Sequence, residues 1–494
     1  MRKHIQLLIT GALLTSLSAC TKHYLDINTD PNNPTESSVD LALPAALGYS
    51  AYNLGNAYQI LGGIWGQYWT QGPTGSQYRS LEQYSITSSD YDRQWESVYA
   101  GPLADFNYLV QEGTRTGKND YVAIGKIMQA YMFQVMTDLH GDIPFSEALA
   151  GAVNTTPKFD SQQEIYDGLI QLLDEAIAIM DGASPPDADD FFYHGDMYLW
   201  YKFANTLKLR VYLRQSYVRP EVAEAGIRAM YADGAEFLDE EEDALVPFSN
   251  EVFNQNPLYA TYEALSSDNL IASATLLDYL QLTKDPRIGN FYARATAAPN
   301  AGNFVGIPQG AGPNLPGVQS ANSYSKPGPA VGGPGSGNNT GAAAPVVFIS
   351  AAESYFLQAE AAARGWSDGD ARALYEEAIR LSFVYWGYTD EEAGAFIAQP
   401  EITFPAGGEE AQLKAILTQK WVSLAGTENL EGWTEWRRSG YPDFFDISAT
   451  SSIGNVFPVR ILYADSEVSR NPKTPAQKTV KDKLWWDVNA NGQN

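Results

Sequence analysis

The sequence predicts an all-α, mainly helical protein that also carries an irregular, loop-rich lobe. Apolar residues recur at helical spacing in several segments, and two segments begin with a Ser followed three residues later by a Glu, the pattern of a capping box. One stretch of 49 residues is too rich in Gly and Pro to form a regular element. With 494 residues, 44% of them hydrophobic, the chain can bury a large core, which excludes a protein that is disordered as a whole.

The clearest predicted helix covers residues 161–180. In its capping box, the side chains of Ser161 and Glu164 each satisfy the exposed backbone donor of the other residue. A single apolar stripe then follows the helix at a spacing of three and four residues. The stripe consists of Ile165, Leu169, Leu172, Leu173, Ala176, Ile177 and Met180.

A helix hairpin is predicted farther along the chain. Ser350 and Glu353 repeat the capping box ahead of a helix at 351–364, Gly365 can end that helix, and a second helix follows at 370–383. The second helix has an Ala, Tyr, Ala spacing that is similar to the second helix of a tetratricopeptide unit, in Ala371, Tyr375 and Ala378. Additional helices are predicted at 120–139, 198–214 and 409–425.

The first residues of the chain predict a cleaved lipoprotein leader. A basic start and an apolar run of about 13 residues, too short to span a bilayer, lead to the small residues before Cys20. This end resembles a bacterial lipobox, which implies a signal peptide at 1–19 and acylation of Cys20. A free cysteine buried in an ordinary helix is the alternative. The mature domain would cover 20–494, and Pro and Asx residues make 20–40 an N-terminal tether.

The Gly/Pro-rich stretch covers residues 297–345. It holds 11 Gly and 8 Pro and a single charged side chain, Lys326. A loop of this length is either a flexible surface excursion or a binding loop, and the sequence leaves both interpretations open.

Composition excludes several classes of function. The chain has 32 Lys and Arg against 59 Asp and Glu. The resulting net charge of -27 repels a phosphate backbone, which disfavours nucleic acid as a partner. One Cys and four His leave no cluster for a metal, and no cofactor motif is found. The chain also has no recognisable nucleophile elbow or carboxylate pair. We therefore expect no catalytic residues, no metal and no cofactor.

A cluster of aromatic and polar residues predicts ligand contact. A flat ring beside amide and guanidinium donors complements a sugar, which has apolar C–H faces and polar rims. The candidates are Trp65, Tyr68, Trp69, Gln71, Tyr78, Arg79 and Tyr84, with Tyr292, Asn322 and Tyr324 as a second group. Trp65 and Trp69 lie four residues apart, so core packing on one helix face is the favoured alternative for that pair.

Six stretches together resemble the SusD/RagB family of surface nutrient-binding lipoproteins from Bacteroidetes. They occur in the family's order, and with the lipobox the likeness runs to the C-terminal end of the chain. The stretches are 138–148 (DLHGDIPFSEA), 200–210 (WYKFANTLKLR), 359–366 (AEAAARGW), 419–421 (QKW), 435–442 (EWRRSGYP) and 484–487 (LWWD). Most of these residues lie in or beside predicted helices, so we interpret them as scaffold rather than as ligand contacts.

The resemblance implies a tetratricopeptide-like helix-hairpin scaffold and a glycan ligand. It also implies a lipid anchor in the outer membrane, with the body facing the extracellular side. The partner would be a SusC-like TonB-dependent transporter, to which captured oligosaccharides or polysaccharides are delivered. Two alternatives remain: a peptide-binding member of the same kind of uptake system, and a surface glycoside hydrolase.

Overall fold

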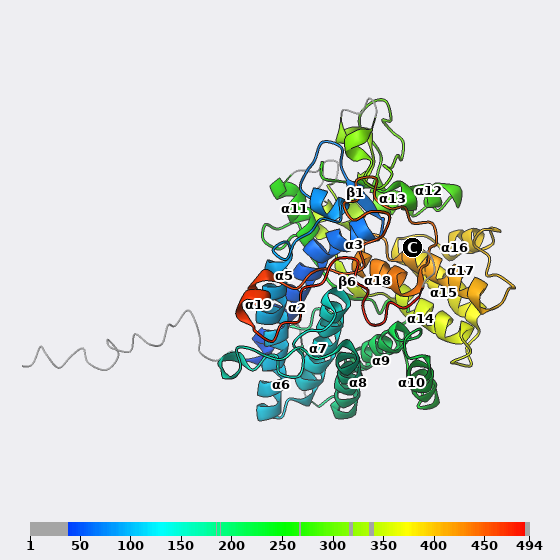
Figure 1. The fold of residues 1–494 in the computed structure, drawn as a ribbon. Helices are drawn as coiled ribbons and strands as arrows, with labels where there is room; N and C mark the ends of the chain where they lie inside the picture. The colour runs from blue at the N-terminus through cyan, green and yellow to red at the C-terminus, as the bar shows by residue number, and fades with distance from the viewer. Residues whose placement is uncertain are drawn as a thin grey trace, which may run out of the picture.

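The structure is a computed structural model in which helices form most of the molecule (Figure 1). Cys20, the leader at 1–19 and nearly all of the tether at 20–40 lie outside the residues that the structure describes. The described residues are 38–183, 185–187, 189–265, 268–315, 320–334 and 340–489. None of the helices in this part of the chain combines the length and the apolar composition needed to cross a membrane.

The N-terminal helices form one side of the scaffold. The first helix α2 (Val39–Asn53) continues through a π-helical turn η1 (Leu54–Tyr58) into α3 (Gln59–Trp65). Farther along, helix α5 (Asp92–Val98) passes through a second π-helical turn η2 (Tyr99–Leu103) into α6 (Ala104–Thr116). Helix α2 packs on α5, η2 and α6, so these elements face each other along much of the length of α2.

All six predicted helices are confirmed. The remaining scaffold helices are α7 (Asn119–His140), α8 (Gln162–Ile179), α9 (Met197–Arg214), α10 (Pro220–Ala232), α14 (Ala351–Ala363), α15 (Ala371–Tyr385), α16 (Asp390–Ile397), α17 (Glu409–Ser423), α18 (Asn429–Ser439) and α19 (Asp465–Arg470). Neighbouring helices pack together in the pairs α6–α7, α7–α8, α8–α9, α9–α10, α14–α15 and α17–α18, which gives the scaffold of helix hairpins.

The two predicted capping boxes have different outcomes. At α8 the box is complete, since Glu164 N–H donates to Ser161 Oγ and Ser161 N–H donates to Glu164 Oε2 at 2.9 Å. At α14 only the Ser350 half exists, with Glu353 N–H donating to Ser350 Oγ at 3.1 Å. The prediction of a reciprocal hydrogen bond from Ser350 N–H to Glu353 is wrong, because the Glu353 carboxylate points into the core, 3.2 Å from Lys420 Nζ.

Short strands and helices make up the remaining lobe. Strand β1 pairs with β3, β2 with β6, and β4 with β5, all antiparallel. The strands are β1 (Trp69–Gln71), β2 (Ala244–Val246), β3 (Leu270–Ala272), β4 (Tyr292–Ala293), β5 (Lys326–Pro327) and β6 (Val346–Ile349). The helices are α4 (Arg79–Glu82), α11 (Pro257–Leu265), α12 (Ala274–Leu282) and α13 (Ile288–Phe291).

The Gly/Pro-rich stretch 297–345 packs onto the protein in its described residues. Apart from the two-residue strand β5, these residues form only 3₁₀ turns, as the composition predicts. The buried side chain of Gln309 donates to the carbonyls of Ile64 at 3.0 Å and Trp69 at 3.2 Å. The stretch is thereby joined to α3 and β1, and its described residues do not form a loose excursion.

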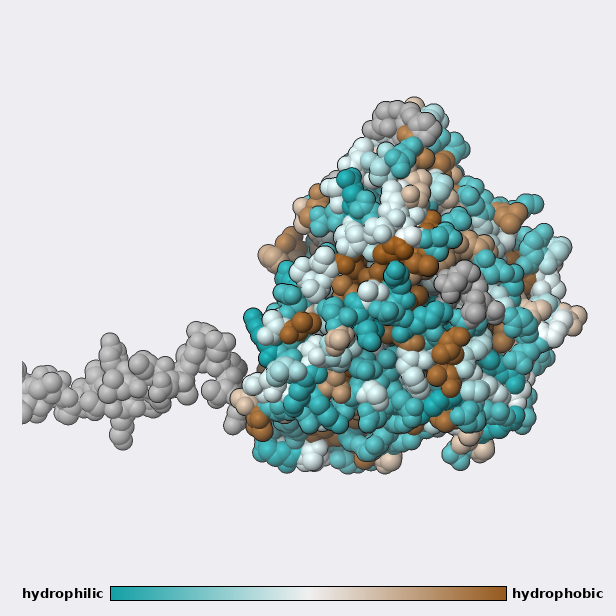
Figure 2. All heavy atoms as spheres, viewed as in Figure 1, coloured by the Kyte–Doolittle hydropathy of each residue, from teal (hydrophilic) through white to brown (hydrophobic). Residues whose placement is uncertain are grey.

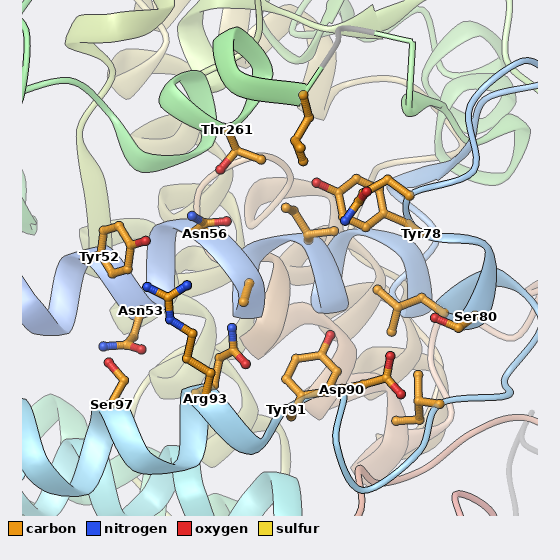
Figure 3. A pocket seen from close by; sticks show the side chains of 17 residues that line it. Tyr52, Asn53, Asn56, Tyr78, Ser80, Asp90, Tyr91, Arg93, Ser97 and Thr261 are labelled. Carbon is orange, nitrogen blue, oxygen red and sulfur yellow. The ribbon is translucent and has the colours of Figure 1, made fainter.

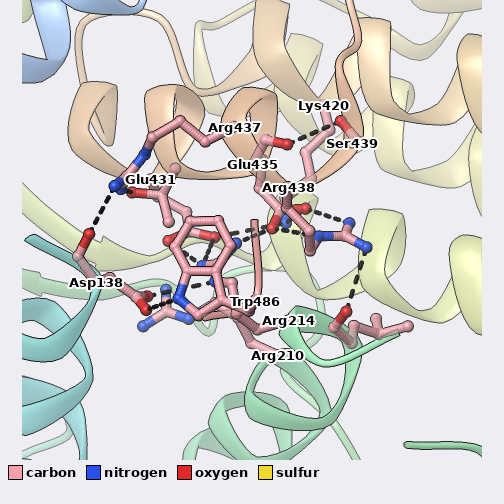
Figure 4. Close-up of polar contacts among 12 residues, drawn as sticks. Asp138, Arg210, Arg214, Lys420, Glu431, Glu435, Arg437, Arg438, Ser439 and Trp486 are labelled. Carbon is pink, nitrogen blue, oxygen red and sulfur yellow. Dashed lines mark hydrogen bonds and ion pairs between the residues drawn. The ribbon is translucent and has the colours of Figure 1, made fainter. Parts of the chain in front are cut away.

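A buried network of charged side chains joins the helices of the scaffold (Figure 4). Arg438 of α18, which is 0% exposed, forms two-point contacts with Glu360 of α14 and with Glu435, at 2.6–3.0 Å. Nη2 of Arg214, on α9, donates to both carboxylate oxygens of Glu431, at 2.5 and 2.7 Å. The network connects α9, α14 and α18, and removal of one partner would leave an uncompensated buried charge.

The surface is polar over most of the face in Figure 2. Hydrophilic residues cover much of the helical scaffold, whereas hydrophobic residues gather in a band between the scaffold and the loop-rich lobe. Most of the large exposed apolar side chains stand singly, as is usual for a protein surface. Val252 and Phe253 are neighbours in sequence, and Tyr49 and Tyr52, which are both about half exposed, lie three residues apart on α2.

Candidate functional site

A pocket of about 340 Å³ opens between α2–η1, α5 and the segment that leads into α4 (Figure 3). Its size falls in the usual range for small-molecule sites. Helix α11 closes one side through Thr261 and Leu265. The other lining residues are Tyr52, Asn53, Asn56, Ala57, Ile60, Gln77, Tyr78, Ser80, Leu81, Ile86, Asp90, Tyr91, Arg93, Gln94 and Ser97.

Several polar groups of this pocket have no partner within the described part of the chain. Gln94 Oε1 is buried and accepts no hydrogen bond. The Asn56 amide and the Arg93 guanidinium form no hydrogen bond or ion pair with any described residue. A buried polar atom without a partner costs free energy, so Gln94 Oε1 is suited to accept a hydrogen bond from a ligand hydroxyl or amide. The partly buried Asn56 amide and the exposed Arg93 guanidinium are available to bond to a ligand as well.

Two tyrosines form the aromatic part of the wall. The ring of Tyr91 stacks on Tyr58, with centroids 6.3 Å apart and planes inclined by 9°. Burial raises the pKa of Tyr78 to about 12, and burial also raises the pKa of Tyr91 well above its usual value. Both phenols therefore remain neutral at physiological pH and can donate a hydrogen bond as well as offer a ring face.

The pocket offers a single carboxylate among its lining residues. This group, Asp90, accepts hydrogen bonds at 2.6 Å from both the backbone N–H and the hydroxyl of Thr87. Glycoside hydrolysis ordinarily needs two carboxylates on opposite sides of the sugar bond. The arrangement is therefore suited to binding and orientation of a ligand more than to cleavage.

Among the first group of predicted residues, the structure brings Tyr78 to the pocket. Gln71 is 2% exposed and does not line the pocket. Its Oε1 accepts a hydrogen bond from the backbone N–H of Tyr78 at 2.7 Å and so helps to position Tyr78 in the pocket wall. Arg79 is exposed beside the pocket, and its Nη2 donates to the carbonyl of Gly75 at 3.4 Å.

The other four members of that group lie in the core. Trp65 packs edge-on against Trp433 and donates its indole N–H to the Leu81 carbonyl at 2.9 Å. Tyr68 stacks on Trp421 and donates to its carbonyl at 2.8 Å. Trp69 and Tyr84 are 1% and 3% exposed. Both Trp65 and Trp69 are in the core, as the alternative expected, but they do not share a helix face, because Trp65 ends α3 and Trp69 begins β1. Ligand contact by these four side chains would require the core to open.

The second predicted group lies away from the pocket. Tyr292 is buried and donates its hydroxyl to the Tyr68 carbonyl at 2.7 Å. Asn322 is exposed and accepts a hydrogen bond from Lys326 Nζ at 2.8 Å. Tyr324 packs with Ile271 and Ile307 in a small cluster of its own. None of the three lines the pocket.

The sequence interpretation missed Asn56, Tyr91, Arg93 and Gln94. Arg93 and Gln94 lie on α5, whose polar residues look like an ordinary solvent face in the sequence. Tyr91 precedes that helix directly. Their meeting with α2 depends on packing between segments about 40 residues apart, so no local spacing could have found it.

A buried carboxyl next to the pocket predicts a pH effect on stability. Glu82 is 2% exposed, and its Oε2 accepts the Gln71 N–H at 2.8 Å. Burial raises its pKa from 4.5 to about 7, although the hydrogen bond opposes this shift. Because the folded pKa is raised, the stabilising contribution is complete below pH 4.5 and is lost as the pH rises through 7, up to about 3 kcal/mol.

Glu82→Gln is therefore expected to remove this loss. Urea unfolding of both proteins at pH 5 and pH 8 measures this loss, and the wild type should lose about 2.5 kcal/mol more than the variant between the two conditions. Equal pH dependence in the two proteins would contradict a raised pKa at Glu82.

Comparison with known proteins decides the family. The chain matches the sequence profile of the SusD-like family described as "Starch-binding associating with outer membrane" over residues 31–464. The chain belongs to this SusD-like family. The predicted resemblance to the SusD/RagB family is thereby confirmed, and with it a family of glycan-binding proteins associated with the outer membrane. No curated protein sequence matches the chain.

Solved SusD-like structures share the fold over nearly the whole chain. A chitin-binding protein is 26% identical with a TM-score of 0.74, covering 90% of this chain and 100% of that chain. A chitin-binding SusD homologue from Flavobacterium johnsoniae is 24% identical with a TM-score of 0.74, covering 91% and 99%. A SusD homologue from Bacteroides fragilis is 22% identical with a TM-score of 0.75, covering 92% and 99%. The predicted helical fold class is confirmed.

Proposed function

We propose that this SusD-like protein captures neutral glycans at the cell surface in the pocket between α2, α5 and α11. The observation that carries the proposal is the composition of that pocket, where two neutral tyrosines stand beside amide and guanidinium groups that have no partner among the described residues. The family description names starch, and one relative more than 25% identical is a chitin-binding protein. Both are glycans of uncharged or weakly charged sugars.

The proposal includes the role in uptake. The protein would be anchored by lipid on Cys20 with its body outside the cell, would have no enzymatic activity, and would pass its ligand to a SusC-like TonB-dependent transporter. The lipobox-like sequence before Cys20 and the family's association with the outer membrane support this part. A co-purification of the tagged protein from native membranes would test the partner, and recovery without any transporter would contradict it.

Tyr78→Ala is expected to weaken glycan binding about tenfold. The variant removes a ring and a phenol donor from the pocket wall. Truncation of an aromatic anchor in a small site commonly costs about 1–2 kcal/mol of binding free energy, which corresponds to about a tenfold loss of affinity. Affinity electrophoresis in gels that contain starch or soluble chitin derivatives measures retardation, and the polymers are afterward checked for shortened chains.

The matched control is Tyr198→Ala. Tyr198 lies on α9, is 51% exposed and does not line the pocket, so its loss should leave retardation unchanged. Equal effects of the two variants on retardation would refute the proposal that this pocket binds the glycan. Shortened polymer would favour the hydrolase, and an absence of retardation on every glycan would favour peptides as the cargo.

A further inference from the structure

A groove of about 890 Å³ continues from the pocket along α2. It lies between α2 on one side and α5, η2 and the start of α6 on the other. We propose that this groove is a second glycan subsite, which holds the continuation of a chain whose first sugars occupy the pocket. The inference rests on the proposed function and makes it more specific: the ligand is an extended, uncharged polysaccharide, and internal stretches of the chain bind better than short ends.

The pocket and the groove are physically continuous. Tyr52, Arg93 and Ser97 line both of them, so a ligand can pass from one to the other without leaving the protein surface. Figure 3 shows the Arg93 side chain rising from α5 toward Tyr52 and Asn53. Because Arg93 is exposed and pairs with no described residue, its guanidinium is available to sugar hydroxyls on either side of this junction.

The groove adds length to the site. From Pro44 to Asn53, α2 advances about 13 Å at the usual rise of an α-helix. The pocket begins where this segment ends, at Asn53 and Asn56. The combined site therefore runs along the axis of α2. An elongated site of this kind fits an extended polymer, whereas a single small molecule would fill only part of it.

Two exposed tyrosines supply the stacking surface in the groove. Tyr49 and Tyr52 are 54% and 50% exposed and lie three residues apart, so they share one face of α2. Neither hydroxyl forms a hydrogen bond with another described residue. Half-exposed rings of this kind match the apolar C–H faces of sugars, while their hydroxyls remain free to bond to sugar hydroxyls.

The floor of the groove is made of small residues. A Cβ atom added at Gly101 would lie 3.4 Å from the Tyr49 ring, an ordinary van der Waals contact, so the ring lies close to the Gly101 backbone. At Gly48 an added Cβ would meet no atom within 4 Å, which shows open space above this part of α2. The space is therefore wide enough for a ligand and is not already filled by the protein.

The charges of the groove favour uncharged sugars. Glu96 and Asp105 line it, opposite in sign to Arg93, and the whole chain carries a net charge of -27. A polyanionic glycan would be repelled by this field, whereas neutral sugars can accept hydrogen bonds from Arg93 and donate to the two carboxylates.

The test compares short and long oligomers of one glycan on the full-length protein in detergent. Isothermal titration with maltose and maltohexaose, and with chitobiose and chitohexaose, measures both subsites. Gly48→Leu blocks the groove, and the open space around Gly48 lets α2 keep its packing. We expect Gly48→Leu and Tyr49→Ala each to weaken hexasaccharide binding about tenfold and disaccharide binding less than twofold. Tyr78→Ala should weaken both.

Gly394→Leu is the matched control. Gly394 lies inside α16 with no atom within 4 Å of an added Cβ, so it repeats the same substitution far from the site. If Gly48→Leu and Tyr49→Ala leave the hexasaccharide unaffected while Tyr78→Ala weakens both ligands, the groove is not a subsite but the proposed function stands. Equal weakening of short and long ligands by Gly48→Leu also overturns the inference. If the wild type binds none of the four sugars, the proposed function fails together with the inference.

Discussion

Replacing Arg438 with methionine is expected to lower the free energy of unfolding by about 3–5 kcal/mol. Arg438 is 0% exposed and reaches from α18 to both α9 and α14, where it donates to the Leu213 carbonyl and to Glu360. Its guanidinium contacts Glu360 at 2.6 and 2.7 Å and Glu435 at 2.7 and 3.0 Å. Its Nη1 also donates to Ser216 Oγ at 2.9 Å. Loss of this cation would leave buried carboxylates and a hydroxyl without their partner.

The size of the effect follows from burial. A charge transferred out of water costs several kcal/mol unless an opposite charge and hydrogen bonds compensate it. Glu360 would retain only Arg364, at 2.9 Å, and Glu435 would retain Arg214 and Lys420. Because a domain is stable by roughly 5–15 kcal/mol in total, a loss of this size removes a large fraction of its stability.

Urea unfolding monitored by circular dichroism measures the change, and Arg228→Met is the control. Arg228 pairs with Glu224 at 2.8 Å on the surface of α10, where the two side chains are 51% and 43% exposed. Exposed pairs of this kind contribute about 0–1 kcal/mol, so the control should stay close to the wild type. A loss at Arg438 no larger than that at Arg228 would show that the network does not stabilise the scaffold.

The helical scaffold could be predicted because its signals are local. The apolar stripe and the capping box of α8 lie within 20 residues of sequence, and the structure forms both. Glu353 shows where local reasoning stops. Its position three residues after Ser350 predicts a reciprocal cap, but Lys420 and Arg210 arrive from distant helices and pair with its carboxylate instead. Long-range electrostatics there outweigh a cap that is worth about 1 kcal/mol.

The candidate site was harder to predict because exposure depends on tertiary contacts. Trp69 has the composition of a sugar-stacking residue, but β1 pairs with β3 and closes the lobe over it. Tyr52 has no such signature in the sequence, and it becomes a wall of the pocket because α5 leaves it half exposed. Tyr78 could be predicted since the Gly and Pro residues just before it predict a loop, and loops carry many binding residues.

The stability of the protein is expected to fall in acid because of His140. This residue ends α7, is 0% exposed, and packs edge-on against Trp95 with ring centroids 4.8 Å apart. Burial lowers its pKa from 6.5 to about 3, and the positive charge of Arg460 adds to this shift, whereas the hydrogen bond to the Leu462 carbonyl opposes it. The imidazole is therefore neutral in the folded protein over most of the acid range.

The sign follows from the two protonation equilibria. Above pH 6.5 the histidine is neutral in both the folded and the unfolded chain, so its contribution is complete. Below pH 6.5 only the unfolded chain takes up the proton, and each pH unit lowers the free energy of unfolding by about 1.4 kcal/mol until the folded pKa is reached. Because the unfolded histidine is already half protonated at pH 6.5, the change between pH 6.5 and 4.5 amounts to about 2.3 kcal/mol.

The variant His140→Gln separates this effect from other titrating groups. Its amide can still donate to the Leu462 carbonyl, but it takes up no proton. Urea unfolding at pH 6.5 and 4.5 should show that the wild type loses about 2.3 kcal/mol more than the variant, because carboxylates titrate in both proteins and cancel in the comparison. A variant with the same acid sensitivity as the wild type would mean that His140 takes up a proton as readily in the folded as in the unfolded chain. Its Nε2, which has no partner among the described residues, would then be bonded to a water molecule or reached by solvent.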